Sequence, residues 1–249
     1  TGGLVGAAFH VSVEKATELR LSHPELIYFL PLAGLLIAAV YRTARIEGAG
    51  TDNIIDSIHS GKDVPPLLVP AIFAATVLTH LCGGSAGREG AALQIGGGIG
   101  CGIGRLVRLD EKQERLAVLS GMSAVFSALF GTPITATVFA LEVCSVGVIH
   151  YSGLLPCSVA ALAAFGITRL FGIAPTRFAV ESVSLDSVML LRVSALAIVC
   201  AAVSIILCEL MHISNRQVRR LFRSTYIRAA VGGVLVIAMT LIVGCRDYN

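Results

Sequence analysis

An arginine and a glutamate stand side by side between two long apolar stretches, in a segment rich in glycine. The segment reads Gly84-Ser85-Ala86-Gly87-Arg88-Glu89-Gly90-Ala91-Ala92-Leu93-Gln94-Ile95-Gly96-Gly97. A carboxylate can bind a proton, and when ionised it can take the place of a bound anion. A helix that begins at Glu89 or Gly90 would also offer free backbone N–H groups and a positive dipole end to an anion. These residue types predict an anion path with Glu89 as gate and proton carrier.

A structural ion pair between Arg88 and Glu89 is the competing interpretation. Adjacent residues of a helix do not face one another and seldom pair well, so the gate interpretation is favoured. Two roles stay open for Arg88, which are electrostatic attraction of anions at the outer mouth and anchoring of the loop. His80 precedes the segment and is expected to form a local hydrogen bond.

The elements around this segment are those of a membrane protein. Apolar residues make up 55% of the 249 positions and charged residues 14%, against about a quarter charged in soluble proteins. Residues 64–87, 116–141 and 143–168 contain no Asp, Glu, Lys or Arg. Each run is long enough to cross a hydrocarbon core of roughly 30 Å as a helix. The composition predicts an all-α polytopic membrane protein.

Glycine and proline divide the apolar runs. We expect Gly131-Thr132-Pro133 to cut 116–141 into two halves that are each too short to span, and Pro65-Pro66 to open the run before the glutamate. Asp52 or Asn53 is the expected N-cap of a helix near Asn53. Further helical segments are expected at Gly2–Val13, Leu26–Tyr41, Val143–Phe171, Val188–Met211 and Ala229–Val243.

Broken helices of this kind are typical of transporters, because irregular backbone within a membrane must line a cavity or pack against protein. Close helix packing is the favoured role of the glycines in 96–104. The basic clusters are expected to face the cytoplasm rather than nucleic acid, since no aromatic residues are interleaved with them. Seven scattered cysteines form no CxxC pair, so neither a metal site nor a disulfide framework is expected. No cofactor is expected either. No HExxH motif is present that would indicate a metal-dependent enzyme, and no enzymatic activity is expected.

Two motifs resemble the CLC family of chloride channels and anion/proton antiporters. Gly87-Arg88-Glu89-Gly90 and the following Gln94-Ile95-Gly96-Gly97 are similar to that family's GREGP and QIGG sequences. The segment from Phe130 to Glu142 resembles its FNAPLAGILFxxE sequence. The resemblance implies tilted and re-entrant helices in two inverted halves, and a homodimer in the lipid bilayer with one ion path per subunit. It also implies that Glu89 is the external gate and that an anion binds near Gly87, Arg88 and the backbone of Gly90, Ala91 and Ala92.

Several departures from the family pattern point to its fluoride-exporting branch. The filter serine is missing near Gly48–Asp52, so Ala49, Gly50 and Thr51 are the candidates for that part of the anion site. Val143 stands where many members carry a proton-relaying glutamate, and Glu142 is expected to be a helix-end charge. Fluoride and chloride both remain candidate substrates.

The expected organisation is a first membrane half over 1–173 with the gating segment 83–104, a linker over 174–188, and an incomplete second half over 189–249. We expect a chain truncated at its C-terminus, in a bacterial-type plasma membrane. Anion/proton exchange is the leading function, and a passive chloride channel of the same fold is the alternative.

Overall fold

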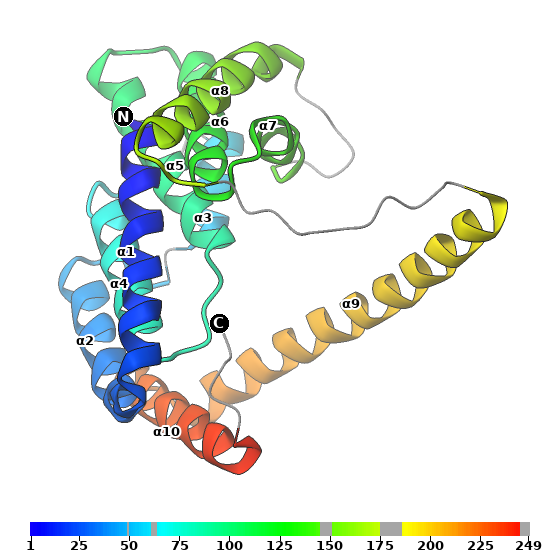
Figure 1. Ribbon diagram of the computed structural model, residues 1–249. Coiled ribbons are helices and arrows are strands. Elements are labelled where there is room, and N and C mark those ends of the chain that lie inside the picture. Colours follow the sequence, from blue (N-terminus) through cyan, green and yellow to red (C-terminus); the bar gives the residue numbers. More distant parts are fainter. Residues whose placement is uncertain (49, 61–63, 145–150, 175–185, 245–249) are drawn as a thin grey trace. The chain divides into compact units, whose positions relative to one another are not determined.

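The computed structural model describes residues 1–48, 50–60, 64–144, 151–174 and 186–244, and the secondary structure within these ranges is helical throughout (Figure 1). The sequence prediction of an all-α protein is confirmed. The helices, in chain order, are α1 (Gly2–Ser22), η1 (Pro24–Phe29), α2 (Leu30–Thr43), α3 (Thr51–Ser60), α4 (Leu68–Leu81), α5 (Glu89–Leu106), α6 (Glu111–Phe130), α7 (Pro133–Glu142), η2 (Tyr151–Gly153), α8 (Leu154–Leu170), α9 (Ser187–Leu221) and α10 (Thr225–Val243).

The chain divides into two compact units. The first unit comprises Thr1–Thr176 and Ala229–Asn249, and the second comprises Arg177–Arg228. This grouping by contact does not test the expected division into two halves at 174–188, which stays a prediction. Residues 175–185 of that expected linker lie outside the described ranges.

Helix α6 lies at the centre of the first unit and packs against α1, α5, α7 and α8. Its start is fixed locally, because the Asp110 carboxylate accepts a hydrogen bond from the Gln113 N–H at 2.9 Å while the Gln113 side chain accepts one from the Asp110 N–H at 3.3 Å. This capping box satisfies two N–H groups that a helix leaves free. Its end is fixed by Gly131, which has a φ of 69° and stops the helix before Thr132-Pro133. The expected break at 131–133 is confirmed.

The glycines of α5 form the seam with α6. A Cβ on Gly96 would collide with the backbone of Gly121, and one on Gly100 would lie 2.7 Å from the carbonyl carbon of Ala117. Further along α6, a Cβ on Gly6 of α1 would lie 2.6 Å from the Cβ of Ala128. Small residues spaced four apart allow such close approach between membrane helices. The packing role predicted for 96–104 is confirmed at these positions.

Four helices in the described ranges are long and apolar enough to cross a membrane. They are Pro24–Thr43, which joins η1 to α2, Tyr151–Leu170, α9 and α10. Helices α4 and α7 are apolar but only 14 and 10 residues long, which corresponds to about 21 and 15 Å. Neither helix is long enough to cross roughly 30 Å of hydrocarbon. Their short lengths agree with the prediction of re-entrant helices. The protein is an integral membrane protein.

Some boundaries differ from the sequence prediction. Helix α1 continues through the charged stretch after Val13, because Glu14, Lys15 and Glu18 are exposed on one face while Val13 and Ala16 are buried on the other. Helix α9 continues past Met211 to Leu221, carrying part of the basic cluster on its last turns. Helix α8 begins at Leu154 rather than Val143, and residues 145–150, including His150, lie outside the described ranges.

Candidate functional site: the N-terminus of helix α5

Glu89 is the first residue of α5, as the sequence predicted. A turn at Cys82-Gly83 and an irregular stretch over 84–87 precede its helix, and Arg88 occupies the N-cap position without a side-chain capping bond. The first N–H groups of a helix have no acceptor within the helix itself. The start of α5 therefore presents N–H groups and the positive end of the helix dipole next to a carboxylate.

The Glu89 side chain is exposed and bends back over Gly87. A Cβ on Gly87 would lie 2.9 Å from Oε2 of Glu89. The described side chains of Arg88 and Glu89 form no ion pair with each other, so the competing structural interpretation has no contact to rest on. The carboxylate can therefore change its rotamer without breaking an ion pair with Arg88.

The three residues that follow Glu89 differ in what they can offer an anion. Gly90 and Ala91 belong to the first turn of α5, whereas the N–H of Ala92 already donates to the carbonyl of Arg88 at 2.9 Å. In this conformation the Ala92 N–H is used within the helix. The assignment of Gly87, Arg88, Gly90, Ala91 and Ala92 to an anion site stays a prediction.

A second helix begins at Thr51, two residues earlier than the expected start near Asn53. The Asn53 side chain does not act as an N-cap, because it lies in the first turn and accepts a hydrogen bond from the Gly50 N–H at 2.9 Å. In a capping box, the side chain of the third helical residue accepts a hydrogen bond from the N-cap N–H, and Asn53 does the same for Gly50. Of the three candidate filter residues, Gly50 and Thr51 therefore lie at the start of α3, and Ala49 lies outside the described residues.

One hydrogen bond joins the two helix starts. Nε2 of Gln94, in the second turn of α5, donates to Oγ1 of Thr51 at 3.0 Å. A Cβ on Gly90 would lie 3.5 Å from the same hydroxyl oxygen. The structure thus brings Glu89, Gly90 and Thr51 together in one region, although α3 and α5 are far apart in sequence. Gln94 stands in a motif noted in the sequence, but its contact with Thr51 could not be read from spacing.

Cationic groups gather beside the segment. Arg20 of α1 is 6% exposed, and the guanidinium groups of Arg88 and Arg20 both act electrostatically on His80. His80 is buried, and its Nδ1 lies 2.8 Å from the Thr76 carbonyl, so the predicted local hydrogen bond is confirmed. Sequence reasoning missed Arg20, because it stands in a charged stretch and nothing in its spacing marks it as buried.

The opposite end of α5 also carries charge. Oε1 of Glu114 accepts hydrogen bonds from Nε of Arg105 and Sγ of Cys101, both at 3.2 Å. Arg105 stands 16 residues after Glu89 on α5, a distance of about 24 Å along the helix. Glu142 is the last residue of α7 and is exposed, as expected of a helix-end charge.

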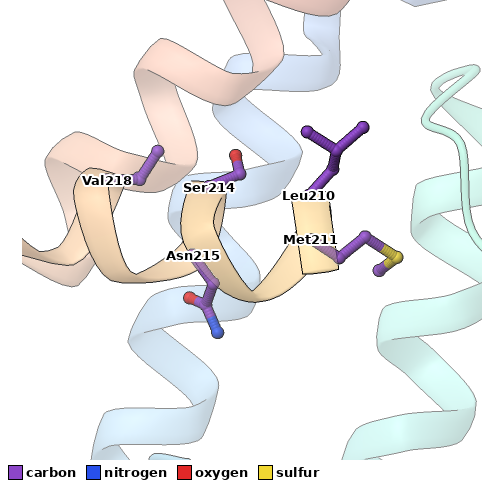
Figure 2. Close-up of a pocket in the computed structure, with 5 residues that line it drawn as sticks. All are labelled: Leu210, Met211, Ser214, Asn215 and Val218. Atoms are coloured by element: carbon purple, nitrogen blue, oxygen red, sulfur yellow. The ribbon is translucent and has the colours of Figure 1, made fainter. Parts of the chain in front are cut away.

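Two other features of the described residues do not form a better candidate site. Among the described residues, no three His, Cys, Asp or Glu side chains are placed to hold a metal ion. In the second unit, one face of α9 lines a shallow pocket, in which Asn215 points away from Leu210 and Val218 (Figure 2). The five lining side chains are Leu210, Met211, Ser214, Asn215 and Val218, none of which is charged. The start of α5 remains the candidate site.

Known proteins with similar sequences are ion channels and transporters. The family described as "Voltage gated chloride channel" matches residues 29–245. A chloride/fluoride channel protein of Pseudomonas syringae pv. tomato is 33% identical over 99% of this chain and 55% of its own length. An H(+)/Cl(-) exchange transporter, ClcA, of Vibrio vulnificus is 30% identical over 56% of this chain and 33% of its own length.

A solved structure shares the fold. The crystal structure of a CLC-type fluoride/proton antiporter superposes with a TM-score of 0.93 at 30% identity, over 99% of this chain and 63% of that chain. This chain therefore spans 55% of the length of the Pseudomonas syringae protein and 63% of the chain of the solved antiporter. The match over residues 29–245, together with the shared fold, shows that the chain belongs to the voltage-gated chloride channel family, the CLC proteins.

Proposed function

We propose that the protein exchanges a halide for protons across a membrane, with Glu89 as gate and proton carrier. The observation that carries the proposal is an exposed carboxylate that forms no ion pair with the side chains that the structure describes, at the uncapped start of α5 and in the region of Thr51. An ionised Glu89 occupies the place of the anion at the helix start. A protonated Glu89 loses its charge and leaves that place to the anion, so that one side chain alternates between proton and halide.

Fluoride is the proposed substrate. No serine stands in Gly48–Asp52, and Val143 replaces the proton-relaying glutamate of many relatives. The solved relative named as a fluoride/proton antiporter and the curated relative named as a chloride/fluoride channel protein support this choice. A passive channel is the second candidate, because Val143 cannot relay a proton and the same curated relative is named a channel.

The basic end of α5 and the start of α6 support an orientation. Arg105, Arg108 and Lys112 gather there, and membrane-flanking clusters of this kind face the cytoplasm. Glu89 at the other end of α5 then faces the outer side. Since the curated matches include bacterial proteins, a bacterial plasma membrane is the proposed location.

Liposome flux with the purified protein tests the proposal. Under a fluoride gradient, wild type should move protons against fluoride in a fixed ratio, with slower chloride movement. Glu89→Gln should abolish proton movement while fluoride still flows down its gradient. Proton coupling that survives in Glu89→Gln would remove Glu89 from the mechanism, and fluoride flux without protons in wild type would favour the channel.

A further inference from the structure

Four arginines gather at the end of α9. Arg216, Arg219 and Arg220 lie in its last turns, and Arg223 follows two residues after the helix ends. Residues three and four apart share one face of a helix, so the first three side chains are neighbours. All four are exposed, and no Asp or Glu stands anywhere in 210–246 to balance them. The end of α9 is therefore a concentrated positive surface.

Most of this charge has no counterpart in the part of the chain that the structure describes. Nε of Arg219 donates to Oδ1 of Asn215 at 3.1 Å. The guanidinium groups of Arg216, Arg220 and Arg223 form no hydrogen bond or ion pair with the described residues. The negative end of the helix dipole stabilises cations only in the last turn, which accounts for Arg219 and Arg220 alone. Like charges on one face repel each other, so an anion from outside the chain would stabilise the cluster.

The fifth arginine of this region is bound to the chain itself. Nη1 of Arg228 donates to the carbonyls of Phe222 and Arg223 at 3.0 and 3.2 Å, and its Nη2 donates to Oγ1 of Thr225 at 3.0 Å. These bonds hold the turn that follows α9 and keep Arg223 next to the end of the helix. Arg228 therefore belongs to the framework of the turn and not to the exposed charge.

The length of α9 places these arginines at the membrane surface. Its 35 residues extend over about 52 Å, roughly 20 Å more than the thickness of the hydrocarbon core. The charge-free part, 193–208, precedes the arginines and is the part that suits the hydrocarbon. The last turns therefore lie beyond the hydrocarbon, at the depth of the lipid headgroups.

A shallow surface groove leads from the apolar part of α9 to this charge. It consists of two hollows that adjoin at Val218, of which Figure 2 shows the first. Leu210 and Met211 line the first hollow, and Arg220 lines the second. The full lining of the second hollow is Gln217, Val218, Arg220 and Leu221. An apolar surface that ends in a guanidinium group fits a phospholipid, with an acyl chain along the helix and the phosphate at its end.

We propose that the end of α9 binds an anionic phospholipid, with the phosphate between the arginines of the last turns and an acyl chain in the groove at Val218. A guanidinium group binds a phosphate through two parallel hydrogen bonds, which makes arginine well suited to this partner. Basic residues directly outside a membrane span also attract the negative surface of an anionic leaflet. Nucleic acid or free phosphate would use the charge but leave the apolar half of the groove empty.

Native mass spectrometry of the purified protein measures the affinity for phosphatidylglycerol. Wild type should bind this lipid at least about tenfold more tightly than phosphatidylcholine, which carries no net charge. The triple variant Arg216→Gln, Arg219→Gln and Arg220→Gln should bind phosphatidylglycerol about a hundredfold more weakly. The reason is that each basic residue near an anionic surface contributes about fivefold.

Arg192→Gln is the matched control, because it removes the same charge from an exposed position near the other end of α9. It should bind phosphatidylglycerol as wild type does. Arg216→Lys, Arg219→Lys and Arg220→Lys together keep the charge and should stay within about fivefold of wild type. Should the triple glutamine variant fail to fold, Arg216→Gln and Arg220→Gln alone should each weaken binding about fivefold.

Three results would overturn the inference. The first is an unchanged affinity for phosphatidylglycerol in the triple glutamine variant, and the second is an equal loss in Arg192→Gln. The third is displacement of the lipid by millimolar inorganic phosphate, which would show that the arginines bind a free anion and not a lipid. None of these results depends on halide transport, so the proposed function of Glu89 is tested separately.

Discussion

The carboxylate of Glu89 lies against the Cα of Gly87, so closely that a Cβ on Gly87 would be 2.9 Å from Oε2. The atom in the way is the far end of a flexible side chain, not backbone. Gly87 is therefore a position where added bulk acts on the proposed gate, Glu89, and hardly on the fold. A methyl group there must displace the carboxylate from its present rotamer.

Gly87→Ala is expected to change transport without loss of stability. The displaced carboxylate should spend less time at the start of α5, so fluoride leak should rise and the proton-to-fluoride ratio should fall. Flux in liposomes measures both quantities, and the midpoint of thermal unfolding in detergent checks the fold. A wild-type ratio in a stable Gly87→Ala protein would show that this contact does not hold the gate.

The glycine seam between α5 and α6 predicts a contrast between two glycines of one helix. A Cβ on Gly100 would meet the backbone of Ala117 and Val118 at 2.7 and 2.8 Å, whereas a Cβ on Gly102 would find no atom within 4 Å. Gly100→Ala must push the helices apart and should cost about 1–3 kcal/mol. Gly102→Ala should be neutral or stabilise by up to about 1 kcal/mol, because alanine favours a helix.

Thermal unfolding of the two variants in one detergent measures this contrast. Equal shifts of the unfolding midpoint in Gly100→Ala and Gly102→Ala would show that helix propensity, and not the packing of α5 against α6, determines the stability of this part of α5. Because neither residue lies at the candidate site, reduced flux in Gly100→Ala should follow its loss of folded protein.

The sequence was sufficient for the features that follow from local chemistry. The start of α5 at Glu89 and the break at Gly131-Thr132-Pro133 depend on residues next to one another, and both were predicted correctly. The contact of Gln94 with Thr51 joins residues 43 positions apart, so it depends on how α3 and α5 pack. Burial of Arg20 has the same origin, since α1 packs against α4 and α6, which are far from it in sequence. Long-range packing of this kind leaves no periodic signal in one sequence.

Two serines of α6 predict a measurable link to α8. The hydroxyls of Ser123 and Ser127 donate to the carbonyls of Cys157 and Ala161 at 3.1 and 2.8 Å, and both serines are fully buried. Hydrogen bonds between membrane helices contribute about 0.6 kcal/mol each on average. Ser123→Ala with Ser127→Ala should therefore destabilise the protein by about 1 kcal/mol.

Ser158→Ala is the matched control for these two serines. Its hydroxyl is exposed and bonds the Leu154 carbonyl of its own helix at 2.7 Å, so no contact between helices is lost. Chemical unfolding of the reconstituted protein compares the variants. If Ser158→Ala lowered the free energy of unfolding as much as the double variant does, the effect would come from loss of any serine hydroxyl and not from loss of the bonds between α6 and α8.

Salt dependence distinguishes the two roles that the sequence left open for Arg88. If Arg88 attracts anions by its charge, Arg88→Gln should raise the KM for fluoride severalfold at low ionic strength. The difference from wild type should shrink when an impermeant salt shortens the screening length from about 30 Å at 0.01 M to about 3 Å at 1 M. Arg88→Lys keeps the charge and should stay close to wild type. If Arg88 anchors the loop by its shape, Arg88→Lys and Arg88→Gln should be impaired alike at every salt concentration, and the electrostatic role would be excluded.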